Sequence, residues 1–258
     1  MNLRRSALLL VAALLTPAMT AAQVTAGEAH LYLAPYYFDS RLTGDGRVSD
    51  GTSGSDFDLE DTLGIEPGET ARGIDGFVSF LGNRIEFSYS SVNMEGRQDL
   101  AEDLVFDGTT FPDQEKIESE VDLTRYKLMY GFHFDLKVVN VGFVVGAHLV
   151  DIDARVSGAG SEEEKSLRVP VPVVGATLGI HPISRLAIHA EVSGFSITVS
   201  GVEAKLVDGY AGLDFLFLPH FGVTAGYRYF LLDAKDDDEE DDIDLVQRGA
   251  YAGLVLHL

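Results

Sequence analysis

Hydrophobic positions recur at every second residue along most of this chain, and the pattern is clearest near the carboxyl terminus. Across Phe221–Ala234, large apolar residues alternate with glycine, threonine and arginine. The next segment, Asp236–Asp244, is acidic at every position except Ile243, and the residues from there to Leu258 alternate again. An apolar face opposite a face of small and polar residues suits a strand with lipid on one side and a wet interior on the other. The pattern therefore predicts a membrane-crossing hairpin with an acidic loop.

The same alternation predicts an all-β fold: a single closed antiparallel transmembrane β-barrel of about ten strands, with eight or twelve as alternatives. The predicted strands are 28–39, 71–81, 84–92, 120–134, 138–154, 167–180, 185–199, 203–217, 221–234 and 245–258. The connections after the second, fourth, sixth and eighth strands are short, whereas 40–69 and 94–119 are predicted to be long loops. Membrane barrels have short periplasmic turns and longer external loops, so both termini are expected in the periplasm.

A soluble barrel is the structural alternative, because alternation alone does not say which face points inward. The polar face of the predicted strands holds many glycines and both signs of charge, which suits a crowded interior better than a solvated surface. We therefore expect the apolar face to contact lipid. The aromatic cluster Tyr36, Tyr37 and Phe38 is expected at the membrane interface, where barrels carry girdles of aromatic residues.

The first 22 residues have the pattern of a secretory signal peptide. Arg4 and Arg5 precede the apolar run Ala7–Leu15, and small residues follow Pro17. A buried N-terminal helix is the alternative, and the run is too short to span a bilayer, which takes about 20 residues. We therefore expect the barrel to comprise residues 23–258.

Composition narrows the chemistry. The net charge is −22, and because nucleic acid is bound mainly through Lys and Arg, this balance argues against a nucleic-acid partner. The chain has no cysteine, which excludes disulfides and thiolate metal sites. The acidic loop Asp236–Asp244 lacks the glycine and ligand spacing of an EF-hand, so we expect a solvated loop, no metal and no cofactor.

Taken as a whole, the mature chain resembles the small bacterial outer-membrane barrels of the OmpA, OmpX and OmpW kind. The resemblance covers nearly the whole mature chain but includes no specific motif. It implies an outer-membrane location, a monomer, and contacts with outer-membrane lipid, lipopolysaccharide and the outer-membrane assembly machinery. Members of this class commonly end in an aromatic residue that the machinery reads, whereas this chain ends in Leu258 and contains no tryptophan.

Ionisable residues on the inward face are the candidate site. These are Asp75, Arg84, Glu86, Arg125, Lys127, His133, His148, His189, Glu191, Asp208, Asp214 and Arg228. In a barrel of eight to ten strands, side chains about fill the interior, so we expect a network of paired charges that plugs the lumen. A narrow solute channel lined by the same residues is the alternative.

The predicted role is non-enzymatic: envelope structure, surface interaction, or limited passage of small or hydrophobic solutes. A hydrolase like the omptin proteases or lipid A deacylases is the alternative. Its candidate residues would be His148 with Asp151, or His189 with Glu191 and Ser193. Residues two apart on one strand have side chains roughly 7 Å apart, too far for a hydrogen-bonded chain, so no catalytic residue is assigned.

Pro170 and Pro172 lie two residues apart in the sixth predicted strand, so both lack N–H donors toward the same neighbouring strand. One hypothesis is a weakened lateral seam in the wall, through which a hydrophobic molecule passes between lumen and lipid. The alternative, which we prefer, is that both prolines stand above the bilayer, where water satisfies the backbone. A complete hydrogen-bond ladder beside Pro170 would exclude the seam.

Overall fold

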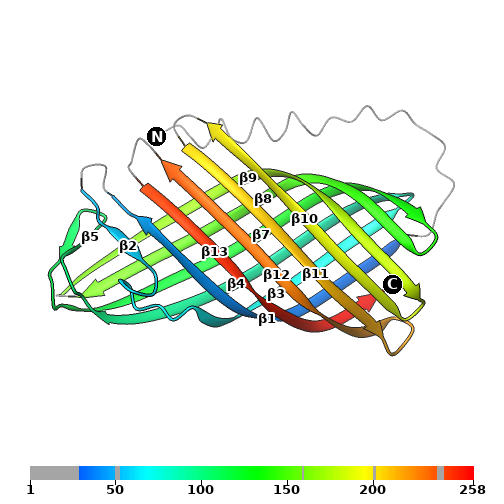
Figure 1. Ribbon diagram of the computed structural model, residues 1–258, viewed down its shortest axis with the longest axis horizontal. Helices are drawn as coiled ribbons and strands as arrows, with labels where there is room; N and C mark the ends of the chain where they lie inside the picture. Colours follow the sequence, from blue (N-terminus) through cyan, green and yellow to red (C-terminus); the bar gives the residue numbers. More distant parts are fainter. Residues whose placement is uncertain (1–28, 50–52, 159, 200–201, 237–240) are drawn as a thin grey trace.

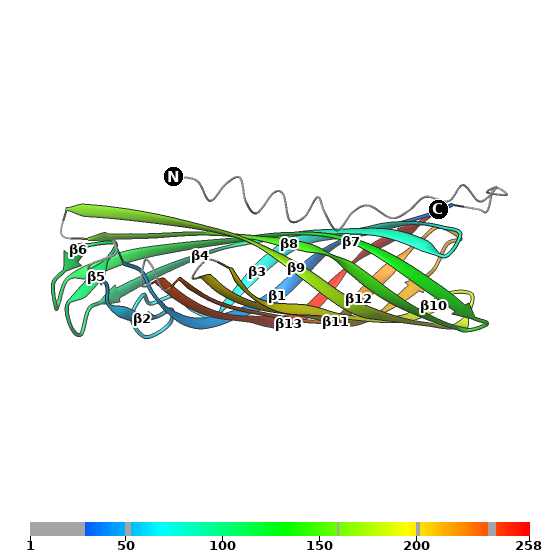
Figure 2. The same cartoon turned by 90° about the horizontal axis from the view of Figure 1, so that it is seen from above.

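The computed structural model describes residues 29–49, 53–158, 160–199, 202–236 and 241–258, which form a long barrel (Figures 1 and 2). The predicted signal peptide lies outside the described residues. The strands are β1 (His30–Arg47), β2 (Asp56–Asp58), β3 (Gly68–Phe80), β4 (Asn83–Asp99), β5 (Leu104–Phe106), β6 (Thr109–Phe111), β7 (Lys116–Leu136), β8 (Val139–Gly158), β9 (Ser161–Ile183), β10 (Leu186–Val199), β11 (Val202–Leu216), β12 (Phe221–Asp236) and β13 (Asp241–His257). Within this part of the chain, no helix is long and apolar enough to cross a bilayer.

Ten antiparallel strands form the wall, as predicted. Their order is β13-β12-β11-β10-β9-β8-β7-β4-β3-β1, and pairing of β13 with β1 closes the cylinder. The closing register runs from Tyr32 opposite His257 to Arg47 opposite Asp242. The short strand β2 pairs with the end of β1, and β5 and β6 form a separate hairpin. Closure matters because lipid offers no partner for the backbone groups of an open sheet edge.

The two ends of the barrel differ. At one end, β1 begins beside the end of β13, where the Leu31 N–H donates to the carbonyl of Leu258, and the connections between strands are tight turns. The opposite end carries β2, β5 and β6 (Figures 1 and 2). Because short turns face the periplasm in membrane barrels, we call the first end periplasmic and the second end external.

An apolar belt surrounds the periplasmic half of the wall. Phe143 is 64% exposed and Leu254 is 62% exposed, whereas Arg125, Glu191 and Arg228 are buried inside. Exposed phenylalanines ring the periplasmic edge of the belt, and exposed aromatic rings lie at its outer edge: Phe80, Phe132, Phe134, Phe215, Phe217 and Phe221 below, and Tyr37, Tyr89, Tyr126, Phe195 and Tyr229 above. On β7 the outward apolar stretch Tyr126–Phe134 matches the roughly 9–11 residues that a tilted strand needs to cross a bilayer. The lipid-facing orientation is confirmed, and the soluble barrel is excluded.

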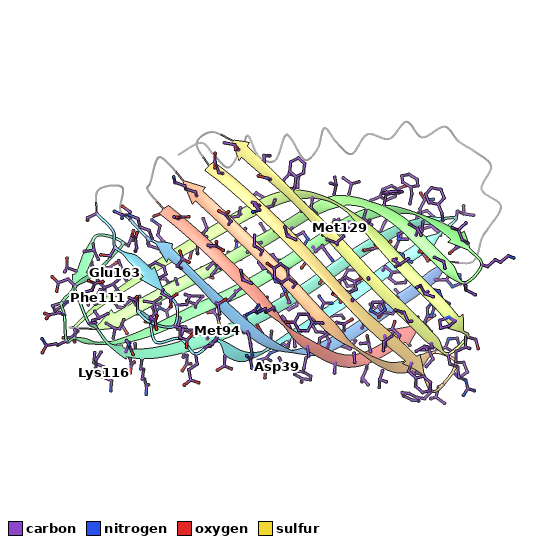
Figure 3. The ribbon with its side chains drawn as sticks, viewed as in Figure 1. Asp39, Met94, Phe111, Lys116, Met129 and Glu163 are labelled. Carbon is purple, nitrogen blue, oxygen red and sulfur yellow. The ribbon has the colours of Figure 1, made fainter. Side chains whose placement is uncertain are left out.

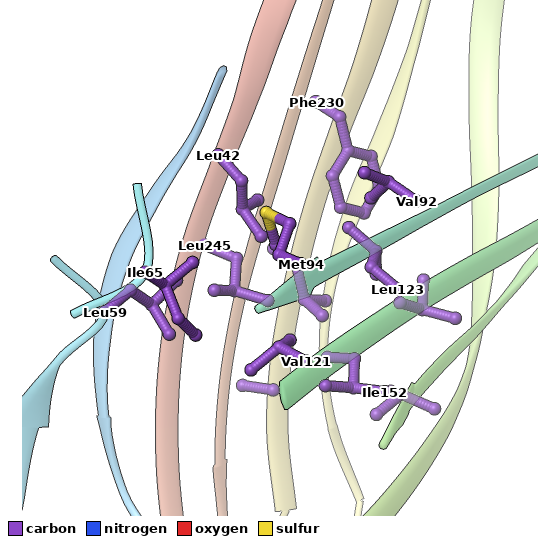
Figure 4. Packing of buried hydrophobic residues seen from close by; sticks show 14 of the residues in the cluster. Leu42, Leu59, Ile65, Val92, Met94, Val121, Leu123, Ile152, Phe230 and Leu245 are labelled. Atoms are coloured by element: carbon purple, nitrogen blue, oxygen red, sulfur yellow. The ribbon is translucent and has the colours of Figure 1, made fainter. Parts of the chain in front are cut away.

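Beyond this belt the polarity of the two faces inverts. On β7 the inward residues change from Arg125 and Lys127 to Leu123 and Val121, which are buried, while the outward residue Asp122 faces solvent. Figure 4 shows Leu42, Met94, Val121, Leu123 and Leu245 converging from different strands into one apolar cluster. The external half of the barrel is therefore built like a soluble protein, with an apolar interior and a charged exterior.

Two predictions about this half were wrong. The predicted loops 40–69 and 94–119 are partly strand, because β1 continues to Arg47, β4 continues to Asp99 and β7 begins at Lys116. Strands β7, β8 and β9 contain 21, 20 and 23 residues, which is more than a bilayer requires. The aromatic cluster is also divided: Tyr37 is exposed, but Tyr36 and Phe38 are buried inside the barrel.

The β5–β6 hairpin and the segment after β2 close the external end. Phe106 and Phe111 of the hairpin are completely buried, and Leu59, Leu63 and Ile65 pack in the same cluster. Figure 3 shows Phe111 and Glu163 together at this end of the barrel. The Lys165 ammonium on β9 lies 3.2 Å from Asp107 in the hairpin turn and 3.4 Å from Asp241 on β13. We call this assembly, residues 56–65 and 104–111, the external plug.

The inversion of polarity predicts different costs for two leucines on one strand. Leu123 is 1% exposed and Leu128 is 61% exposed. Leu123→Ala is expected to lower the free energy of unfolding by about 2–5 kcal/mol, because it leaves a cavity in the apolar cluster. Leu128→Ala, which leaves no cavity, is expected to cost less than half as much. Denaturant unfolding in lipid vesicles measures both, and equal losses would contradict the inverted packing.

Candidate functional site

The barrel interior at the level of the membrane belt is the candidate site. The structure places every ionisable residue predicted to face inward on this inner surface. Asp75 and Arg84 retain some exposure, as does His189, and the others are buried: Glu86, Arg125, Lys127, His133, His148, Glu191, Asp208, Asp214 and Arg228. They come from strands on opposite walls, so the chain sequence separates residues that the barrel brings into contact.

Lys127 is the centre of an ion-pair chain that crosses the lumen. Its ammonium lies 2.8 Å from a carboxylate oxygen of Glu191 on β10 and 3.4 Å from Asp208 on β11. Arg125, also on β7, lies 3.5 Å from Asp208 and donates to the hydroxyl of Ser90. Because buried charges persist when they are paired, this layer links β7 to the opposite wall.

A second link joins β12 to β3 through Arg228 and Asp75, whose side chains form an ion pair. The guanidinium of Arg228 also lies over three tyrosine rings, 4.2 Å from the centre of Tyr36, 5.0 Å from Tyr210 and 4.9 Å from Tyr251. A guanidinium is planar, so it can form an ion pair and stack on aromatic rings at the same time. The compact ammonium of lysine cannot stack in this way.

Glycine on the inner face makes room for these rings. A Cβ atom added to Gly212 would lie 2.1 Å from the Tyr251 hydroxyl and 2.9 Å from the His189 ring. The Tyr251 hydroxyl and His189 Nε2 are hydrogen-bonded at 3.1 Å across this position. At Gly212, the missing side chain therefore leaves the space that the Tyr251 and His189 side chains from neighbouring strands occupy.

A cavity of about 180 Å³ lies below the ion-pair layer and faces the periplasmic end. Its walls include Tyr32, Tyr36, Asp214 and Tyr251, and His181 and Arg185, near the β9–β10 turn, also line it. Asp214 accepts a hydrogen bond from the Tyr32 hydroxyl at 3.2 Å and lies 3.4 Å from His189 Nδ1. The interior thus has three levels: external plug, ion-pair layer and periplasmic cavity.

The two candidate catalytic sets are not assembled. His148 points into the lumen, whereas Asp151 is paired with Arg168 on the outer face, so the two side chains lie on opposite sides of β8. His189, Glu191 and Ser193 share the inner face of β10, but His189 contacts Asp214 and Tyr251, and Glu191 contacts Lys127 and Tyr210. The Ser193 hydroxyl is buried and makes no hydrogen bond to His189 or Glu191.

Pro170 and Pro172 lie on the outer face of β9. Along this face toward the external end, the next residue is Arg168, which is the first charged one. The β8–β9 ladder runs unbroken through both prolines, so their missing N–H groups face β10. On that side the pairing of β9 with β10 ends at Val174 and Gly194, before it reaches Pro172. The prolines therefore border an unpaired stretch of the wall, and no ladder hydrogen bond is lost at either of them.

Carboxylates gather at the external rim. Asp244 on β13 lies directly opposite Asp45 on β1 and opposite Asp233 on β12. Partial burial, then repulsion from Asp233, Asp45 and Asp242, raises the pKa of Asp244. Among the described residues, no three or more His, Asp or Glu side chains are arranged to hold a metal ion. Residues 237–240 of the predicted acidic loop lie outside the described residues.

Comparison with solved structures identifies the architecture. The outer membrane protease OmpT from Escherichia coli matches with a TM-score of 0.52 and 10% identity, covering 92% of this chain and 99% of that chain. The fold is that of the bacterial outer-membrane β-barrels. At such low identity the likeness concerns the fold alone. Together with the apolar belt, this fold places the chain in the bacterial outer membrane.

Two further matches have lower TM-scores. Ail, the attachment invasion locus protein of Yersinia pestis in complex with a heparin analogue, has a TM-score of 0.38 and 15% identity, covering 89% of this chain and 100% of that chain. Neisserial surface protein A has a TM-score of 0.37 and 11% identity, covering 89% of this chain and 99% of that chain. No protein-family model matches the sequence, and comparison with curated proteins finds no match.

Sequence reasoning missed the external plug and the partner of each interior charge. A signal was present for the apolar interior against which the plug packs: apolar residues continue at alternate positions in the upper parts of β7 and β8, but on the face opposite to the lipid-facing one. A search for strands with one fixed apolar face stops where that face becomes polar. The pairing of Lys127 with Glu191 has no such signal, because it depends on which strands face each other across the lumen.

Removing Lys127 tests the ion-pair layer. Lys127→Met keeps most of the volume but leaves Glu191 and Asp208 short of a cation in a buried site, so the free energy of unfolding is expected to fall by about 3–5 kcal/mol. Arg155→Met is the control, because the Arg155 side chain also contacts several carboxylates but is 42% exposed. Its loss should be much smaller, and a comparable loss would show that burial does not strengthen the layer.

Proposed function

We propose that this protein is a closed, non-enzymatic outer-membrane barrel that anchors a rigid, charged extension outside the cell. The proposal rests on one observation: the lumen is occupied at two successive levels, by the Lys127 ion-pair layer and by the external plug. Either level alone obstructs the passage of solutes. The ionisable residues predicted to face inward would then fill the lumen and would not line an open channel.

The outer surface fits a role in envelope structure or surface interaction. Above the lipid belt the long strands β7, β8 and β9 present Glu118, Asp122, Arg155 and Glu164 outward from a firmly packed apolar interior. Such an extension is a stable platform for contacts with lipopolysaccharide or with molecules outside the cell. We expect a monomer that the outer-membrane assembly machinery inserts.

The unpaired stretch between β9 and β10 resembles a sheet edge protected against pairing with another strand more than a route for hydrophobic solutes. Behind it, Val169, Val171 and Val173 are buried in the apolar interior. Prolines on an exposed sheet edge remove donors that another strand would use, which prevents unwanted pairing. We therefore propose that Pro170 and Pro172 guard this edge.

Conductance in planar lipid bilayers tests the closed lumen. The purified full chain, inserted at a density verified by protease protection, is expected to give no stepwise ion current, because two occupied levels lie in series. A barrel of the same size with a free lumen would give regular current steps. Steady steps from the wild-type chain would overturn the proposal and favour the narrow channel.

Surface labelling tests the orientation on which the proposed role depends. An epitope tag inserted after Gly160, at the external β8–β9 connection, is expected to bind antibody on intact cells. The same tag inserted after Gly82, in the tight β3–β4 turn, should bind antibody only after the outer membrane is permeabilised. The reverse result would place the plug and the long strands in the periplasm and refute a role at the cell surface.

A further inference from the structure

Three exposed arginines lie on adjacent strands at the external edge of the apolar belt. Arg41 is on β1, Arg72 on β3 and Arg248 on β13, and β1 lies between the other two strands. The residue before each arginine is buried, so all three side chains point outward. On β3 and β13 the arginine is the first charged residue of the outer face beyond the belt, whereas on β1 Asp39 comes first. We call these three arginines the arginine patch.

The strand register sets the neighbours of the patch. Arg41 and Arg248 lie directly opposite each other across the β1–β13 pair. Arg72 lies opposite the exposed ring of Tyr37 on β1, and Arg248 lies opposite that of Tyr229 on β12. Directly opposite side chains have Cβ atoms about 4.5–5.5 Å apart, and like charges at that spacing destabilise a sheet. An anion held between Arg41 and Arg248 would replace this repulsion with attraction to a shared partner.

Other exposed arginines of the external half have carboxylates beside them. Arg97 lies 3.1 Å from Glu118, and Arg155 lies within 3.4 Å of three glutamates on β7 and β9. Arg168 is paired with Asp151. The register gives the patch another arginine and two tyrosine rings as neighbours instead. In a chain with a net charge of −22, this grouping makes a local cationic surface at the edge of the membrane.

The surroundings of the patch define where an anion can lie. Toward the periplasmic end, the outer face becomes apolar, and Leu254 on β13 is 62% exposed. Toward the external end, Asp45 and Asp244 lie directly opposite each other, four residues beyond the arginine pair. These carboxylates repel an anion that moves outward from the patch. A phosphate joined to acyl chains fits this position, because the chains can lie on the belt while the phosphate reaches the arginines.

We propose that the arginine patch binds the phosphate groups of lipopolysaccharide, whose acyl chains lie on the apolar belt below. Arginine suits this partner because its planar fork forms paired, charge-assisted hydrogen bonds with phosphate. The patch lies on the external side of the belt, so the ligand comes from the outer leaflet. This site deepens the surface role proposed above, since it names the lipid and the residues that hold it, and it rests on the same orientation of the barrel.

Native mass spectrometry tests the site with the full barrel, refolded without lipopolysaccharide in a neutral detergent. The probes are lipid A with two phosphates, lipid A without phosphates, and phosphatidylglycerol. Phosphorylated lipid A is expected to bind at least about tenfold more tightly than the dephosphorylated form, since charge-assisted hydrogen bonds are roughly twice as strong as neutral ones. Phosphatidylglycerol, with one phosphate, should bind more weakly than phosphorylated lipid A, and inorganic phosphate at equal concentration should not displace lipid A.

Two double variants locate the site. Arg41→Gln with Arg248→Gln removes the opposed charges and should lower the affinity for phosphorylated lipid A by about tenfold or more. Arg97→Gln with Arg155→Gln is the matched control, because it removes the same charge from exposed arginines that have carboxylate neighbours. The control should keep the affinity within about twofold of the wild type.

Denaturant unfolding of the same proteins gives a second readout. Without lipid, the Arg41→Gln/Arg248→Gln variant should unfold at a higher denaturant concentration than the wild type, because two opposed like charges are gone. Saturating lipid A should raise the unfolding midpoint of the wild type more than that of the variant, since a ligand stabilises only the state that binds it.

Several results would overturn the proposal. Equal binding of lipid A with and without phosphates would exclude a phosphate site, and equal losses in the two double variants would assign binding to overall charge. Phosphatidylglycerol that binds as tightly as lipid A, or displacement of lipid A by inorganic phosphate, would exclude a lipopolysaccharide site. None of these results changes the expected conductance or the surface labelling, so this site and the proposed function can fail separately.

Discussion

The requirement that every backbone N–H and C=O group in hydrocarbon has a partner within the protein governs this structure. Pairing of β1 with β13 satisfies it by closing ten strands into a cylinder, which leaves no edge at the level of the lipid belt. The ladder between β9 and β10 ends at Val174 and Gly194, at the outer part of the wall. The two prolines of β9 face this unpaired side. The need to hydrogen-bond the backbone thus determines where the wall of the barrel must be continuous.

Within that wall, apolar and polar residues alternate along each strand both in the membrane and in the external half. Below the level of Arg125 the apolar face of each strand contacts lipid and the polar face fills the lumen. Above it, the apolar face turns inward and packs as in a soluble protein, with Leu123 and Ile152 buried. The polypeptide achieves this with no change of register, because the period of two is the same whichever face is apolar. A membrane barrel and a water-soluble cap are therefore continuous along the same strands.

The interior charges follow from the size of the barrel. Ten strands leave a lumen that side chains about fill, so ionisable groups inside it need partners in contact distance. Lys127 and Arg228 meet this need from opposite walls, and their pairs connect strands that are distant around the sheet. Asp214 differs, because its closest partners are the Tyr32 hydroxyl and the His189 ring and not a lysine or an arginine.

Local pattern alone determined the all-β class, the antiparallel order of neighbouring strands and the lipid-facing side of the belt, because each depends on alternation and on loop length, which are properties of short segments. The pattern also marked Arg125, Lys127, Glu191, Asp208 and Arg228 as inward. It misread the external ends of β1, β4 and β7 as loops, since the apolar face there changes sides. Only the tertiary structure decided which charges meet across the lumen, that Tyr36 and Phe38 are buried, and that Asp214 contacts Tyr32 and His189. Those facts depend on strand tilt and on which walls face each other, and no single segment contains that information.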